Sequence, residues 1–176
     1  MSSSHARAIE SLCPKCNLCC NGVLFADVEL QTGDDPDSLK AYGIKLRRKG
    51  RKKCFSQPCT ALQDDGMCSA YADRPGMCRE FECGLLLRVA SDELSVEAAT
   101  KKIRKAQRLA KKVRELLELL GNTDTELALT KRYQAVMMEP IDMAGSEELV
   151  DARGELMLTV QELMDLASRE FLAMPD

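Results

Sequence analysis

Residues 13–20 read CPKCNLCC, and this stretch decides how the first half of the chain folds. Two overlapping C-x-x-C units put Cys13, Cys16 and Cys19 on one tight loop, where successive sulfurs can point inward toward a metal. Three cysteines at this spacing, with a fourth from elsewhere, also match a loop that holds a four-iron, four-sulfur cluster. The thiols of Cys19 and Cys20 are adjacent and cannot easily reach one metal. We therefore expect them to point to different metals, or one of them to bridge two.

The chain has nine cysteines, all of them between Cys13 and Cys83. Residues 1–12 lack the apolar run of a signal peptide, and no stretch is long enough to span a membrane. We therefore expect a cytoplasmic protein with no membrane partner, whose thiols stay reduced and hold metal. An odd number of cysteines also fits a pure disulfide framework poorly. These observations favour zinc or iron ligation over disulfide bonds.

The remaining cysteines are spread between residues 54 and 83, and the last part of this segment is the most diagnostic. Residues 68–83 read CSAYADRPGMCREFEC. Together with CPKCNLCC, this pattern resembles the bacterial YkgJ-type CxxCxxCC cysteine-cluster family, whose members are described as zinc- or iron-chelating. The resemblance covers residues 13–83 and, on the sequence, stops short of the helical half.

The resemblance implies which cysteines bind metal, and Cys54 lies outside its pattern. Eight thiolates suffice for two four-ligand sites, or for one cluster plus spare cysteines. Arg74 and Arg79 belong to the motif, and we expect them to donate hydrogen bonds to thiolates or to brace the loop rather than to bind an anionic partner. The eight implied metal ligands are Cys13, Cys16, Cys19, Cys20, Cys59, Cys68, Cys78 and Cys83.

From residue 96 onward, apolar residues recur at alternating spacings of three and four, as on one face of a long helix. Gly121 and Asn122 are residues that commonly end a helix. A second helix is expected from Asp124 or Thr125 to just before Pro140, and a third after the N-cap Ser146. The apolar stripe of the first helix consists of Val96, Ala99, Ile103, Ala106, Ala110, Val113, Leu117 and Leu120.

These patterns divide the chain into three parts. Residues 1–12 are expected to form a disordered tail, residues 13–90 a small irregular metal-stabilised module, and residues 91–176 an all-α helical hairpin or three-helix bundle. Within the module, residues 23–25 are expected to form a strand and residues 38–48 a helix. We also expect metal removal to unfold the module while the helices persist.

Charge is unevenly distributed, with a balance of +7 over residues 1–114 and −10 over residues 115–176. Residues 45–53, KLRRKGRKK, carry seven positive charges. A solvated loop that offsets thiolate charge is favoured over a nucleic-acid surface, because no aromatic side chains are interleaved for stacking on bases. The cations of the first long helix are expected to form its solvent face and to pair with the acidic third helix.

The function that these features favour is metal chelation by a protein that is not an enzyme. One alternative is an iron–sulfur redox or radical-type enzyme, since flagellin lysine methylases are distant relatives of the cysteine cluster. Against it stand the single histidine, His5, and the absence of a nucleotide or methyl-donor motif. Another alternative is a metal-stabilised adaptor that binds a protein or RNA and forms a homodimer through its helical stripe.

Overall fold

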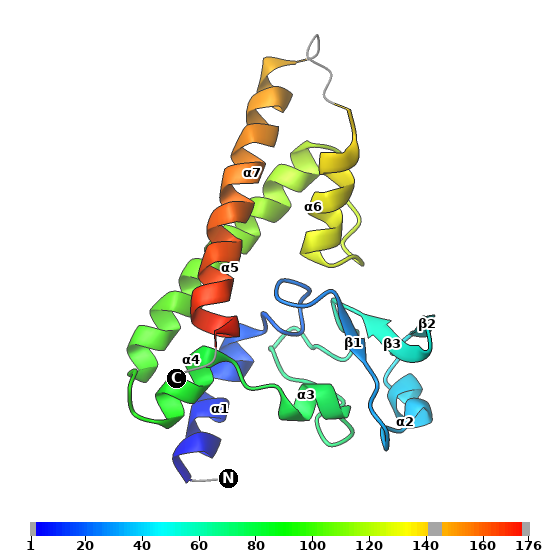
Figure 1. Ribbon diagram of the computed structural model, residues 1–176, viewed down its shortest axis with the longest axis vertical. Coiled ribbons are helices and arrows are strands. Elements are labelled where there is room, and N and C mark those ends of the chain that lie inside the picture. The colour runs from blue at the N-terminus through cyan, green and yellow to red at the C-terminus, as the bar shows by residue number, and fades with distance from the viewer. Residues whose placement is uncertain (1–2, 141–145, 174–176) are drawn as a thin grey trace.

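The computed structural model describes residues 3–140 and 146–173. Figure 1 shows two long helices, α5 (Val96–Leu119) and α7 (Glu147–Ala167), with the shorter α6 (Leu129–Met138) beside them. Residues 13–83, which contain all the cysteines, form loops, short helices and a small sheet at the end of the molecule away from the start of α7. A cysteine-rich region followed by long helices is therefore present, as the sequence predicted.

Helix α5 follows directly from the apolar stripe. The Ser95 hydroxyl accepts a hydrogen bond from the backbone N–H of Ala98 at 3.2 Å, which caps the first turn. The last turn closes where Gly121 adopts φ +83° and the N–H of Asn122 donates to the Leu117 carbonyl at 2.8 Å. Its stripe is buried, including Ala99, Ile103, Ala106, Ala110, Val113 and Leu117.

Helix α7 packs along α5, and α6 packs against α5 as well. The Nζ atoms of Lys105 and Lys112 lie 2.7 Å and 2.5 Å from carboxylate oxygens of Glu162 and Glu155, so the expected pairing between the basic and acidic helices is present. The start predicted for the middle helix is wrong, because residues 124–128 form a loop before α6 begins at Leu129. A π-helical turn, Ser168–Leu172, continues α7.

The predicted disordered tail is also wrong over its described residues. Residues 3–16 form helix α1 (Ser3–Cys16), in which Ala8 and Leu12 are buried against α4 (Gly84–Ala90) and α5. Three-dimensional packing stabilises this segment, which has too few apolar residues to predict a helix by itself. As a result, one hydrophobic core runs from α1 through α4 to the long helices.

A three-stranded antiparallel sheet lies beside the cysteine loops, in the order β1–β3–β2. Its strands are β1 (Asp27–Glu29), β2 (Leu46–Lys49) and β3 (Lys52–Ser56). The strand predicted at residues 23–25 is wrong, because the first strand of the sheet, β1, begins at Asp27. The helix predicted over residues 38–48 is shorter and earlier, as α2 (Pro36–Ala41), because residues 46–49 pair with β3 instead. None of the helices within the described residues is long and apolar enough to cross a membrane.

Candidate metal centre

The first four cysteines lie around the C-terminal end of α1. Cys13 and Cys16 occupy its last turn. Asn17 then takes φ +56°, and its carbonyl accepts hydrogen bonds at 2.9 Å from the N–H groups of Cys20 and Asn21. This tight turn places Cys19 and Cys20 directly after the helix. The prediction of one loop for Cys13, Cys16 and Cys19 is therefore wrong for the first two, which are helical.

The next two cysteines are tied to this loop by backbone hydrogen bonds. The N–H of Cys59 donates to the carbonyl of Cys20 at 2.8 Å. Leu62 forms a β-bridge with Cys68, and the N–H of Ser69 donates to the Ala61 carbonyl at 2.8 Å. Cys59 and Cys68 are therefore held together, on the side of the loop that carries Cys20.

The last two cysteines lie within or directly before short helices. Cys78 is in α3 (Gly76–Glu80), and Cys83 is the residue before α4. Gly84 has no room for a side chain, because a Cβ atom would lie 2.3 Å from the carbonyl oxygen of Ala173. The packing of α4 against the C-terminal turn thus fixes the position of Cys83.

Packing divides these cysteines into two groups. Cys16 and Cys83 contact the core that includes α1, α4 and the long helices. Cys59, Cys68 and Cys78 contact a second, smaller core under the sheet, which is formed by Val28, Leu39, Ile44, Phe55, Ala61 and Ala70. Leu18 of the first cysteine loop belongs to the larger core, whereas Cys19 and Cys20 of that loop belong to neither core.

The pKa shifts of the thiols follow the same division in the first group. Burial, followed by the charge of Cys83, raises the pKa of Cys13 to about 11. Burial raises the pKa of Cys16 to about 12; an N–H from Leu18 opposes the shift, and Cys83, Cys13 and Cys20 add to it in that order. Burial also raises the pKa of Cys19 well above its ordinary value, with the largest charge contribution from Cys16 and the next from Cys20.

In the second group, burial raises the pKa of Cys20 to about 11, and the next largest causes are the charges of Cys59 and Cys68. Burial raises the pKa of Cys78 to about 12, followed by the charges of Cys20, Cys59 and Cys68. The largest charge effects on the pKa of Cys20 thus come from Cys59 and Cys68, although Cys20 also interacts with Cys13, Cys16 and Cys19 of the first group.

Arg74 and Arg79 have different surroundings. Arg74 lowers the pKa values of Cys13, Cys20 and Cys78, against the larger effect of burial, so its charge faces both groups. Its guanidinium lies 3.8 Å from the centre of the Tyr71 ring. Arg79 donates from Nη1 to the carbonyl of Arg74 at 2.7 Å, which braces the loop between Cys68 and Cys78.

Cys54 is placed differently from the other eight cysteines. It is fully buried in the central strand β3, opposite Glu29 on one neighbouring strand and Arg47 on the other. It lies outside both cores that the other cysteines contact. This position agrees with its place outside the sequence motif.

The donor set fits zinc or iron, because thiolates are ligands that both metals take, and backbone N–H donors and the guanidinium of Arg74 act on several of these thiols. Within residues 3–140 and 146–173, however, no group of three or more His, Cys, Asp or Glu side chains converges closely enough to hold a metal ion. Ligation therefore requires the thiols of each group to close up by side-chain rotation. All nine cysteines are free thiols, which leaves them able to do so.

Three further residues support the cysteine loops, and the sequence did not predict this role for any of them. The Gln107 side chain of α5 donates to the carbonyls of Lys15 and Cys16, at 2.7 Å and 3.2 Å. Gly66 lies so close to the first loop that a Cβ atom would be 2.2 Å from the Pro14 carbonyl oxygen. His5 lies 2.7 Å from the carboxylate of Glu82, next to Cys83. These long-range contacts leave no periodic signal in the sequence.

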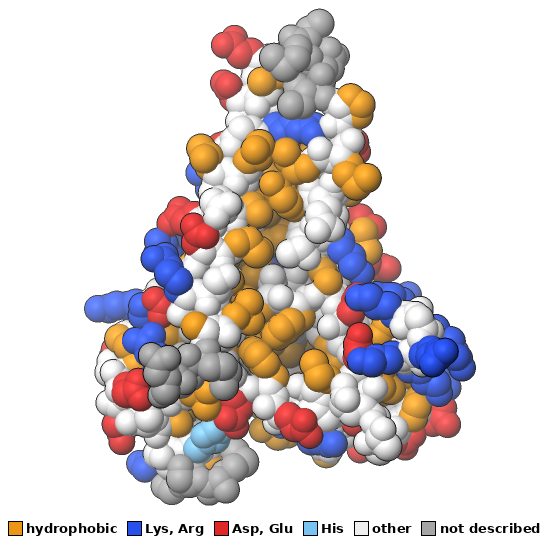
Figure 2. Space-filling view, in the orientation of Figure 1, with side chains coloured by type: hydrophobic (Ala, Val, Ile, Leu, Met, Phe, Trp, Pro, Cys, Tyr) orange, Lys and Arg blue, Asp and Glu red, His pale blue; other side chains and the backbone are white. Residues whose placement is uncertain are grey.

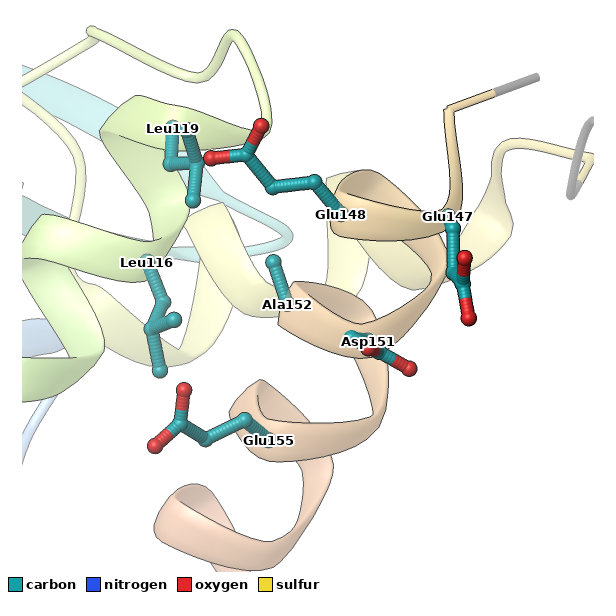
Figure 3. A pocket seen from close by; sticks show the side chains of 7 residues that line it. All are labelled: Leu116, Leu119, Glu147, Glu148, Asp151, Ala152 and Glu155. Atoms are coloured by element: carbon teal, nitrogen blue, oxygen red, sulfur yellow. The ribbon is translucent and has the colours of Figure 1, made fainter.

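A hollow between the long helices is far from the cysteines (Figure 1). It has a volume of about 450 Å³ and lies between α5 and α7 (Figure 3). Leu116 and Leu119 face it from α5, whereas the carboxylates of Glu147 and Asp151 point away. It contains no thiol, so the grouping of the cysteines, and not the size of a cavity, identifies the candidate site.

A family model described as "CxxCxxCC: Putative zinc- or iron-chelating domain" matches residues 12–112. The match continues into α5, so the limit that the sequence suggested at residue 83 is too short. This agrees with the core that joins α1 and α4 to α5. No curated protein and no solved structure matches the chain.

Proposed function

Since the chain belongs to the CxxCxxCC family of putative zinc- or iron-chelating domains, we propose that it binds two metal centres through eight cysteine thiolates. The first centre uses Cys13, Cys16, Cys19 and Cys83, and the second uses Cys20, Cys59, Cys68 and Cys78. The supporting observation is that Cys16 and Cys83 pack on one core, whereas Cys59, Cys68 and Cys78 pack on the other. The largest charge effects on the remaining thiols support the same grouping: Cys83 acts on Cys13, Cys16 acts on Cys19, and Cys59 acts on Cys20. Cys54 is a buried strand residue and takes no part.

The thiols of this chain hold their protons tightly before a metal arrives. Burial raises the pKa of Cys13 to about 11 and that of Cys78 to about 12, so both are protonated at neutral pH. A bound cation supplies the positive charge that stabilises the thiolates, and ligation releases their protons. Metal affinity is therefore expected to rise as the pH increases from neutral toward the pKa values of the thiols. Arg74 reduces the negative charge that remains on both centres.

The metal can be identified on protein purified without oxygen. A colourless protein with about two zinc ions per chain fits two four-thiolate zinc sites. A brown protein with stoichiometric sulfide fits an iron–sulfur cluster, for which the spacing of Cys13, Cys16 and Cys19 is suited. A protein without stoichiometric metal would refute the proposed function.

The assignment of cysteines to centres predicts how paired substitutions combine. Cys13→Ser with Cys83→Ser removes two ligands from one centre and is expected to lower the metal content by one centre. Cys83→Ser with Cys78→Ser removes one ligand from each and is expected to lower it by two. Cys54→Ala is the control that retains both. Equal metal loss in the two paired variants would contradict this assignment while leaving chelation itself intact.

A further inference from the structure

Residues 45–53, here called the basic hairpin, consist of β2, a turn at Gly50 and Arg51, and the start of β3. The strand register places Arg48 opposite Lys53 and Lys49 opposite Lys52. Like charges directly across two strands destabilise a sheet. Folding alone therefore does not favour this arrangement.

On one face of the hairpin, carboxylates of β1 neutralise the cations. Asp27 pairs with Arg47 and Lys49, and also with Lys131 of α6 at 3.2 Å. Glu29 pairs with Lys52 at 2.5 Å. These ion pairs account for the charges on this face.

Side chains alternate along a strand, so Leu46, Arg48 and Lys53 lie on the opposite face. They line a hollow of about 260 Å³, together with Lys40 and with Arg47, whose guanidinium is paired with Asp27 of β1. Four of the five lining residues are basic and none is acidic. The carboxylate beside them is that of the exposed Asp37, which pairs with Lys40 at 2.7 Å, so positive charge is left in excess.

Two structural explanations for this charge are insufficient. Cations on an edge strand prevent unwanted strand pairing, and β2 is an edge strand. However, Lys53 belongs to the central strand and Lys40 to α2. Compensation of thiolate charge does not account for these cations either, because the cation that lowers the pKa values of Cys13, Cys20 and Cys78 is Arg74, in the loop between Cys68 and Cys78.

We propose that this face of the basic hairpin binds the phosphate backbone of nucleic acid. Figure 2 shows the Lys and Arg side chains gathered over the hairpin at the right of the view. None of the exposed large hydrophobic residues lies within residues 45–53, so the surface has no apolar side chain to insert into a membrane. Phe55 is buried and cannot stack on bases. The contacts are therefore with phosphates and independent of base sequence.

The test is fluorescence anisotropy with the full-length, metal-loaded protein and a labelled single-stranded RNA of about 20 nucleotides, at salt concentrations from about 50 to 200 mM. We expect binding that weakens with salt. The double variant Arg48→Glu, Lys53→Glu is expected to bind roughly ten-fold or more weakly, with a shallower salt dependence. Unchanged metal content and circular dichroism will show that this variant is folded.

A matched control carries Arg104→Glu and Arg108→Glu on the exposed face of α5, which changes the net charge equally. This control is expected to bind RNA within about two-fold of the unmodified protein, because those residues make no phosphate contact in the proposed site. Equal loss of binding in both variants would overturn the proposal, as would absence of binding at about 50 mM salt. Equally tight binding of polyglutamate would refute the preference for phosphate.

Discussion

The long helices and the cysteine region between residues 17 and 83 are stabilised in different ways. Helices α5 and α7 bury a continuous apolar stripe, in which Val113, Leu117 and Leu156 are fully buried. The cysteine region has a smaller core, short strands and many turns that depend on single backbone hydrogen bonds. Apolar packing is therefore sufficient for the first region, whereas the second depends on its thiols and on what they bind.

Metal removal should produce the largest difference in stability between the two regions. A structural zinc site contributes on the order of 10 kcal/mol to folding. With a chelator under reducing conditions, we expect residues 17–83 to lose protection from amide hydrogen exchange while α5 and α7 keep it. Helices α1 and α4 are expected to remain with α5, because they share its core.

This expectation replaces the boundary at residue 90, where the sequence placed it, with boundaries at Cys16, where α1 ends, and at Cys83, which precedes α4. Re-addition of metal is the control and should restore protection. If α5 and α7 lost protection together with the cysteine loops, the two regions would form one cooperative unit.

Shortening a buried side chain in the core of the long helices should have the next largest effect. This effect falls on the helices and not on the cysteine region. Leu156 is fully buried between α7 and α5, so Leu156→Ala is expected to lower the free energy of unfolding by about 3–5 kcal/mol. Leu158→Ala is the control, because Leu158 is 75% exposed. Denaturant unfolding measures both variants, and both should keep their metal. Loss of metal from Leu156→Ala at temperatures where it remains folded would contradict the comparison.

The same difference determines what the sequence could predict. The helices α5 and α7 were predicted because a repeated apolar spacing has only one efficient way to be buried. The basic hairpin was not predicted, because residues 45–53 contain a single apolar side chain, Leu46, and show no alternation. Helix α1 was missed since its burial depends on α4 and α5, which are distant in sequence.

The arrangement of the cysteines could be predicted from the sequence only in part. The adjacency of Cys19 and Cys20 predicts that they point to different metals, or that one of them bridges two, and this stays a prediction. Which distant cysteines join each of them cannot be read from the spacing. The proposed assignment joins Cys83 to the first loop because α4 packs on α1, and Cys59 to Cys20 because their backbones share a hydrogen bond.

Substitution of a glycine in the cysteine region should lower the free energy of unfolding more than substitution of a glycine in the basic hairpin. Gly66 has φ +83°, and an added Cβ would lie 2.2 Å from the Pro14 carbonyl oxygen. Gly66→Ala is expected to cost about 2–4 kcal/mol, from backbone strain and overpacking, and to weaken metal binding by displacing the first loop. Gly50→Ala is the matched control, with φ +62° and no atom near its Cβ.

The control should cost only about 1–2 kcal/mol and leave metal affinity unchanged, because it carries the strain without the collision. Competition with a chromophoric chelator gives the affinity, and thermal unfolding gives the stability. Equal effects of the two substitutions would show that the approach of Gly66 to the first loop does not support the cysteines.

The smallest expected effect has the opposite sign. Arg48→Glu replaces a like-charged cross-strand pair with an ion pair to Lys53 and should raise the free energy of unfolding by about 0.2–1 kcal/mol. Because the proposed phosphate site loses a cation, the same variant should bind RNA less tightly. A surface selected for stability alone would lose stability on this change, whereas one selected for binding gains stability and loses affinity. Thermal unfolding and anisotropy on the same preparation distinguish the two, and a variant that is less stable and binds RNA unchanged would leave the hairpin with a structural role only.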